Sequence, residues 1–175
     1  MEDKIFTLKE NRTGNKACYS TCLTVSVMKK RIVFNFLAES SSLFAPYSGY
    51  NEPLFDGDVC EIFIGDKANY YEIEVAPNGA VLFAKITNYG NGGFSTKLLP
   101  LAEKEKLLVT SARVFGGYEV TIEIERSAFE DENVFFNAFR IDTDGGEKAE
   151  KHLFSVFPTL RNSFHLSEVF EKLEL

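Results

Sequence analysis

The chain has 175 residues, a length typical of one domain with a sizeable hydrophobic core, and we expect residues 1–175 to form a single domain. The formal net charge of −7 argues against non-specific binding to nucleic acids, which requires a positive surface. Hydrophobic residues make up 45% of the chain, which excludes a disordered polypeptide, and the 17 Phe and 7 Tyr favour β-strands.

The N-terminus has no apolar segment of the kind found in signal peptides, and no run approaches the roughly 18 apolar residues of a membrane span. We therefore expect a cytoplasmic protein that does not bind membranes. Cys18, Cys22 and Cys60 are then expected to be reduced thiols. Neither His152 nor His165 has the spacing that would complete a metal site with Cys18 and Cys22.

Two strands and a long loop are predicted before residue 54. Residues 20–27 and 31–39 alternate between two faces, the pattern of half-buried strands. Residues 40–53 contain two Pro, a Gly and several Ser, and they read as a long loop of the kind that often carries function. Tyr47 and Tyr50 lie in this loop, where their rings either stack on a ligand or close the end of the fold.

Carboxylates at alternate positions mark the next two predicted strands, residues 58–64 and 70–75. Glu61 points to one face of the first strand, while Glu72 and Glu74 share one face of the second. The Pro-Asn-Gly sequence that follows has the residues of a tight turn. A sheet face that carries several glutamates beside tyrosines is not what stability alone would favour. This hairpin is therefore the first candidate for a functional site.

The rest of the chain also reads as short strands and turns. We expect strands at residues 80–86, 107–115, 118–125, 134–142 and 153–157, a Gly/Asn-rich loop at 87–96, and a tail that forms either a helix or a turn and a last strand. No helix is long enough for a crossover between parallel strands. The sequence therefore predicts an all-β fold, an antiparallel β-sandwich of immunoglobulin-like or jelly-roll type with about nine to eleven strands and at most short helical turns.

Several segments, taken in order, resemble carbohydrate-binding module family 9, whose sandwich is related to DOMON-like domains. The matching segments are LFDGDVCEIFI (54–64), YYEIEV with PNG (70–79), FNAFRI (136–141), FPT (157–159) and FH (164–165), with Phe170 and Leu173 near the end. Cys60 stands where the family pattern has Val. The resemblance spans roughly residues 30 to 175 and implies a sandwich that binds sugars without catalysis.

Members of that family hold one or two sugar units between two Trp rings. The resemblance places Phe55 at the first ring and matches Glu61 to the carboxylate of the family motif. For the second ring it offers Phe154, Phe157 and Phe164 without deciding among them. Because the chain has no Trp, its rings have less stacking area than those of the family.

Sugar recognition combines ring stacking with charge-assisted hydrogen bonds to hydroxyl groups. The candidate ligand-binding residues are Phe55, Glu61, Glu72, Glu74, Asn137, Arg140, Tyr47 and Tyr50. In a structural alternative, Arg140 neutralises the glutamates in a buried network. We expect a carbohydrate partner and no catalytic residues, cofactor or bound metal.

Other function classes remain open at this point. Two carboxylates roughly 5–9 Å apart would suit a glycoside hydrolase, although no nucleophile–base set accompanies them. A structural or protein-interaction sandwich that has lost its sugar site is the other alternative. Asp56, Asp58 and Asp66 are oxygen-rich but match no standard calcium loop.

Overall fold

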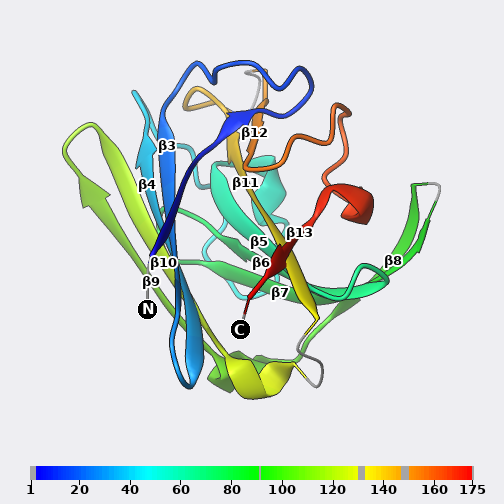
Figure 1. The fold of residues 1–175 in the computed structure, drawn as a ribbon. Coiled ribbons are helices and arrows are strands. Elements are labelled where there is room, and N and C mark those ends of the chain that lie inside the picture. Colours follow the sequence, from blue (N-terminus) through cyan, green and yellow to red (C-terminus); the bar gives the residue numbers. More distant parts are fainter. Residues whose placement is uncertain (1–2, 91, 130–132, 147–149, 175) are drawn as a thin grey trace.

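Two antiparallel sheets pack face to face in the computed structural model, which describes residues 3–90, 92–129, 133–146 and 150–174 (Figure 1). The five-stranded sheet runs, in spatial order, β1 (Lys4–Thr7), β3 (Thr21–Val27), β4 (Arg31–Glu39), β10 (Gly117–Glu125) and β9 (Leu107–Val114). The eight-stranded sheet runs β2 (Lys9–Glu10), β12 (His152–Ser155), β11 (Val134–Asp142), β5 (Val59–Gly65), β6 (Asn69–Val75), β7 (Val81–Gly90) and β8 (Gly93–Leu98), and β13 (Glu171–Leu173) pairs with β11. The predicted all-β sandwich is confirmed.

The described residues contain thirteen strands, and two strands that were not predicted, β2 of two residues and β8 of six, account for the excess over the predicted nine to eleven. Helical structure is limited there to the short 3-10 turns η1 (Leu54–Asp56), η2 (Leu101–Lys106), η3 (Arg126–Ala128) and η4 (Ser167–Val169). None of the helices in the described part of the chain is long and apolar enough to cross a lipid bilayer. The tail forms η4 and then β13, so the second of its two predicted forms is correct.

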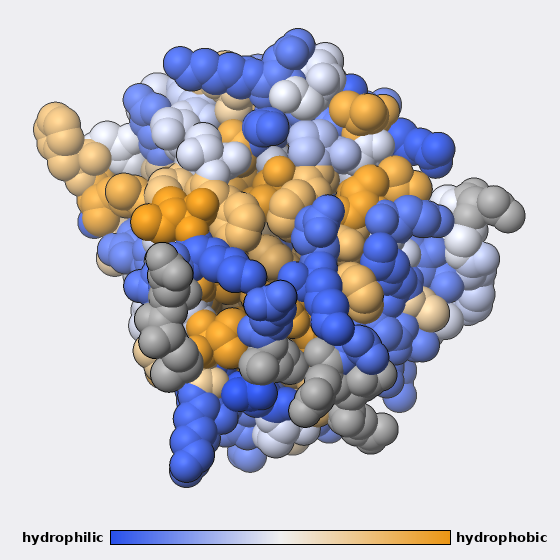
Figure 2. Space-filling model, in the orientation of Figure 1, coloured by the Kyte–Doolittle hydropathy of each residue, from blue (hydrophilic) through white to orange (hydrophobic). Residues whose placement is uncertain are grey.

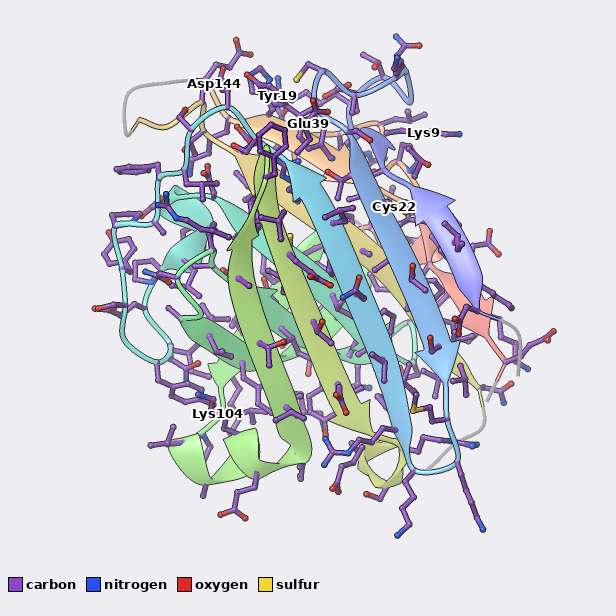
Figure 3. The ribbon with its side chains drawn as sticks, turned by 90° about the vertical axis from the view of Figure 1, so that its left-hand side faces the viewer. Lys9, Tyr19, Cys22, Glu39, Lys104 and Asp144 are labelled. Carbon is purple, nitrogen blue, oxygen red and sulfur yellow. The ribbon has the colours of Figure 1, made fainter. Side chains whose placement is uncertain are left out.

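Alternation in the strands produces the core between the two sheets. Ile32, Phe34 and Phe36 of β4 all point inward and are completely buried. Their neighbours along the strand point to the outer face of the five-stranded sheet, which Figure 3 shows from the front. On that face the Asn35 side-chain amide donates hydrogen bonds to Glu119 (2.7 Å) and Thr121 (2.8 Å). A polar row therefore covers the solvent side of this sheet.

The centre of the eight-stranded sheet is buried on both faces, unlike its partner sheet. Every residue of β5 is buried, because a second apolar cluster lies on the side that faces away from the sandwich interior. We call it the outer cluster; it includes Phe63, Tyr70 and Phe139 from the sheet and Phe164 and Phe170 from the C-terminal segment. In Figure 1, η4 and the curved end of β8 lie on the same side of this sheet. Figure 2 shows apolar side chains across the middle of the molecule, between polar regions.

One predicted loop is a hairpin instead. The sequence pattern predicts a loop at residues 87–96, but β7 continues to Gly90 and β8 begins at Gly93. The register between these two strands is irregular between Asn88 and Gly90. Glycine and asparagine obscured the strand pattern, and β8 is an exposed edge strand that needs no continuous apolar face. Strand β8 is important for the candidate site because it brings Phe94 to the wall of the pocket.

Gly117 gives a test of how tightly β10 and β4 pair. A β-carbon at this position would overlap the backbone carbonyl of Ala38 on the neighbouring strand, which cannot move aside as a side chain can. We expect Gly117→Ala to lower the free energy of unfolding by about 2–3 kcal/mol in urea denaturation. Gly146→Ala is the matched control, because nothing lies within 4 Å of its added β-carbon. Equal stability of the two variants would contradict this packing.

Candidate functional site

The three predicted glutamates meet on the face of the eight-stranded sheet that carries the outer cluster. Glu61 on β5 lies directly opposite Glu74 on β6, and Glu72 lies opposite Phe63. Each carboxylate has one oxygen that lies within 4.8 Å of an oxygen of each of the other two. Among the described residues, no other group of three acidic side chains comes this close together. The side chains are almost completely buried, with Glu61 2%, Glu72 8% and Glu74 1% exposed. We call Glu61, Glu72 and Glu74 the glutamate cluster.

The glutamate cluster lines a pocket of about 750 Å³. Aromatic rings surround it, and Phe55 is 46% exposed while Phe94 is 41% exposed. Phe55 belongs to η1, which is anchored by buried Leu54, and this turn holds the Phe55 ring at the pocket. A pocket with an acidic floor and exposed aromatic rings suits a ligand that has both a flat apolar face and polar hydrogen atoms.

Burial and mutual repulsion change the acidity of the glutamate cluster. Burial raises the pKa of the Glu72 carboxyl to about 7. Burial raises the pKa of Glu74 to about 9, and the charge of Glu72 adds to the increase. Burial, followed by the charges of Glu74 and Glu72, raises the pKa of Glu61 well above its usual value. Near neutral pH the cluster therefore holds protons, because three charges cannot ionise fully so close together.

Two carboxylate oxygens of the glutamate cluster lack any partner. Glu61 Oε1 and Glu74 Oε2 are buried and make no hydrogen bond within the described residues. An unsatisfied buried polar atom of this kind costs about 1–3 kcal/mol, which makes it a natural contact point for a bound group. Both oxygens belong to pocket-lining residues but are covered, so a ligand in the pocket reaches them only if the carboxylates rotate towards it.

His165 and Phe94 line the pocket, although neither is among the predicted ligand-binding residues. The His165 ring stacks between Phe94, at a centroid distance of 3.7 Å, and Phe63, at 4.9 Å. Its Nδ1 lies 2.9 Å from the Tyr70 hydroxyl. Burial lowers the pKa of His165 to about 4, so the ring is neutral near pH 7. Nothing local in the sequence reveals that the Tyr70 hydroxyl, 95 positions away, is the partner of His165.

Arg140, predicted as a ligand-binding residue, is not beside the glutamate cluster and does not line the pocket. The alternative in which it neutralises these carboxylates does not apply either. On β11, Arg140 pairs with Cys60 in the register and points into the sandwich interior, whereas Phe139 pairs with Glu61. The guanidinium is fully buried, forms an ion pair with Asp142 and donates a hydrogen bond of 2.8 Å to Thr21. It also lies 5.5 Å from the ring centroids of Tyr118 and of Phe154.

Asn137 shares the face of the glutamate cluster, but its side chain holds the backbone. The amide nitrogen donates to the Phe157 carbonyl at 2.8 Å, and the amide oxygen accepts from the Ala138 and Phe157 backbone amides. It is completely buried and does not line the pocket. Asn137 therefore fixes the segment after β12 beside β11.

The two loop tyrosines also lie away from the pocket lining. Tyr50 donates from its hydroxyl to the Leu99 carbonyl at 3.2 Å and packs on the core between the sheets. Tyr47 packs on the outer cluster, and its carbonyl accepts a hydrogen bond from Asn78. Both rings thus help to close the fold, which is one of the two roles left open for them above.

The second clamp ring was left open among three phenylalanines, and they occupy three different places. Phe154 is buried between the sheets beside Arg140, and Phe157 packs on the same core. Phe164 lines the pocket, but it is 9% exposed and stacks on Phe139 at 4.2 Å. The exposed ring that shares the pocket with Phe55 is Phe94.

The aspartates considered for calcium are held separately. Asp58 is buried and accepts hydrogen bonds from Thr143 and from the Phe44 amide. Asp66 caps the β5–β6 turn by accepting from two backbone amides. Asp56 forms an ion pair with Lys151 at 3.3 Å. The three carboxylates serve three local structures and do not form one oxygen cage.

Comparisons with solved structures identify proteins that share this fold. No protein-family model matches the sequence, and no curated protein matches it. The crystal structure of a protein from Bacteroides uniformis ATCC 8492 matches with a TM-score of 0.78 at 17% identity, covering 99% of this chain and 86% of that one. That protein has a proposed role in carbohydrate binding.

Two structures of a family 9 carbohydrate-binding module from Caldicellulosiruptor kristjanssonii also match. The complex with cellotriose gives a TM-score of 0.64 at 13% identity, covering 98% of this chain and 82% of that one. The complex with glucose gives 0.62 at 14% identity, covering 97% and 84%. As the sequence resemblance predicted, the chain has the fold of the family 9 carbohydrate-binding modules.

Proposed function

We propose that the protein is a non-catalytic carbohydrate-binding domain that takes a mono-, di- or oligosaccharide into the pocket above the glutamate cluster. The observation that carries the proposal is the pairing of two exposed aromatic rings, Phe55 and Phe94, with buried carboxylates in one pocket. Aromatic rings stack on the apolar face of a pyranose, and carboxyl groups exchange hydrogen bonds with its hydroxyls. The fold neighbours that hold cellotriose and glucose support the same use of this architecture.

A hydrolytic role for the glutamates has less support. Glycosidase carboxyl groups are separated by about 5–5.5 Å in retaining enzymes and about 6.5–9.5 Å in inverting ones. One oxygen of each carboxylate in the glutamate cluster lies within 4.8 Å of the other two, which is closer than the spacing that admits a water molecule in inverting enzymes. Release of reducing sugar from an oligosaccharide would overturn the non-catalytic assignment, and the assay belongs beside the binding experiment.

The proposal predicts that the two exposed rings are required for binding. We expect Phe55→Ala and Phe94→Ala each to weaken the affinity for glucose, cellobiose or the best ligand of a glycan panel by about 10- to 100-fold, because each removes a stacking surface. Isothermal titration calorimetry measures the affinities, and thermal unfolding checks that the variants are folded.

Phe115→Ala is the matched control, because Phe115 is fully exposed and does not line the pocket. It should bind sugar as the wild type does. Equal binding by all three variants would place the ligand elsewhere. Absence of binding across a broad panel would favour the alternative of a structural or protein-interaction sandwich.

A further inference from the structure

The glutamate cluster has no positively charged partner within the described part of the protein. Arg140 faces the sandwich interior and is paired with Asp142. Lys151 is the only cation whose charge affects Glu61, and its ammonium is held by the Phe55 carbonyl at 2.8 Å and Asp56 at 3.3 Å. Burying three carboxylates without a cation raises the free energy of the folded protein. A ligand that supplies a cation lowers this free energy, which favours its binding.

We propose that the pocket selects sugars that carry a protonated amino group, with the ammonium seated between Glu61, Glu72 and Glu74. This inference rests on the proposed function, because it assigns a ligand class to the same pocket. The sugar ring then lies against the exposed Phe55 and Phe94 rings. The partnerless Glu61 Oε1 and Glu74 Oε2 are the acceptors that remain free for the ammonium.

The spacing of the carboxylates allows this seat, because none of the three separations exceeds 4.8 Å and all three oxygens are within reach of one ammonium group. An ammonium group has three N–H donors, and three hydrogen bonds of about 2.8 Å at tetrahedral angles place their acceptors about 4.6 Å apart. The glutamate cluster offers three acceptor oxygens within 4.8 Å of one another. Three donors can therefore meet three different carboxylates, which a neutral hydroxyl with a single hydrogen atom cannot do.

A divalent metal ion is the competing occupant, and the rest of the pocket suits it less well. Calcium takes 6–8 oxygen ligands, so a site here needs several beyond the three carboxylates. The side-chain oxygen of Asn51 already accepts from the Phe83 amide, and the Ser163 hydroxyl accepts from the His165 amide. Thr96 and Asn162 could add one side-chain oxygen each, and the phenylalanine rings of the lining offer no ligands.

Proton release accompanies the seating of an ammonium group. The carboxyls of Glu72 and Glu74 hold protons near neutral pH, since burial raises the pKa of both. A cation favours the ionised form, so its binding expels protons, whereas a neutral sugar has no such effect. Two other groups near the cluster keep their protonation state near neutral pH, because burial lowers the pKa of His165 to about 4 and raises the pKa of the Tyr70 hydroxyl. Asp56 and Lys151 form an ion pair.

Calorimetry with three matched sugars at about pH 6.5 tests the proposal. At this pH an amine with a pKa near that of an α-amino group, about 7.7–8.0, is mostly protonated. We expect D-glucosamine to bind at least about tenfold more tightly than D-glucose, because its bonds to carboxylates are charge-assisted, and N-acetyl-D-glucosamine to lose this advantage. Titrations in two buffers of different ionisation enthalpy should show release of on the order of one proton with glucosamine and none with glucose.

Two isosteric variants assign the preference to the cluster. Glu72→Gln and Glu74→Gln should each bring the ratio of glucosamine affinity to glucose affinity closer to one. Glu105 is an exposed carboxylate on η2, and Glu105→Gln should leave this ratio unchanged. Binding assays in the presence of calcium and manganese ions, and of a chelator, accompany the titrations.

The outcomes separate the two proposals. If glucose binds as tightly as glucosamine and Phe55→Ala abolishes both, the amino-sugar assignment is wrong and the proposed function stands. If none of the sugars in the wider panel binds, both fall. Binding of calcium or manganese that is lost in Glu74→Gln, without a preference for glucosamine, overturns the assignment in favour of a metal site.

Discussion

Replacing Arg140 with methionine is expected to lower the free energy of unfolding by about 3–5 kcal/mol, because the change leaves the partner of a buried ion pair without its counter-ion. Arg140 and Asp142 are 0% and 1% exposed, so neither charge can be solvated in the folded state. The hydrogen bonds to Thr21 and to the Glu39 carbonyl are lost at the same time. Urea denaturation of the variant against the wild type measures the effect.

Arg113→Met provides the matched control, since Arg113 is exposed on β9. The same chemical change there should alter stability by less than about 0.5 kcal/mol. A small decrease in the free energy of unfolding of Arg140→Met would show that Asp142 finds another partner or takes up a proton. Arg140 would then be less important for joining the two sheets than its contacts indicate.

Glu74→Gln is expected to stabilise the protein at pH 8 by about 2 kcal/mol, equivalent to about 4–8 °C in Tm for a chain of this length. Burial raises the pKa of Glu74 to about 9 and that of Glu72 to about 7, above the value of about 4.5 in an unfolded chain. The folded state therefore binds more protons than the unfolded state in this range. Stability falls as the pH rises from about 4.5 towards 9, and glutamine removes that loss at position 74.

Thermal unfolding at pH 4.5 and at pH 8 checks the sign. At pH 4.5 the wild-type carboxyl is already protonated in the fold, so the variant should gain little there. His165 acts in the opposite direction, because its pKa is lowered to about 4 and stability is lost as the pH falls from about 6.5 to 4. Comparing variant with wild type at each pH cancels this contribution. Destabilisation by Glu74→Gln at pH 8, beyond that of Glu105→Gln, would contradict the proton-holding cluster.

Alternation along the chain predicted most of the architecture. The strands at residues 31–39 and 134–142 were placed as they occur, because period-two patterns directly specify a sheet with two distinct faces. The same rule placed Glu61, Glu72 and Glu74 on one face. It also separates Asn137 from Arg140, which lie three positions apart on β11 and so point to opposite faces.

The walls of the pocket were harder to predict because they depend on contacts far apart in sequence. Phe94 reaches the pocket only because β8 pairs with β7, and the alternation of Phe94, Thr96 and Leu98 was the local sign of that strand. His165 has no such sign, since Tyr70 and Phe63 come to it only through the folded C-terminal segment.

The position of the glutamate cluster in the middle of paired strands restricts how the binding preference can change over generations. Insertion of one residue before Glu61 in β5 would turn every later side chain of that strand to the opposite face, placing the Glu61 carboxylate in the core and Ile62 and Ile64 on the pocket side. Loop-built sites tolerate changes in length, and this site does not. New preferences are therefore expected to arise by substitution at fixed positions, and relatives with different ligands should keep the spacing of β5 and β6 while they differ in the residues that face the pocket.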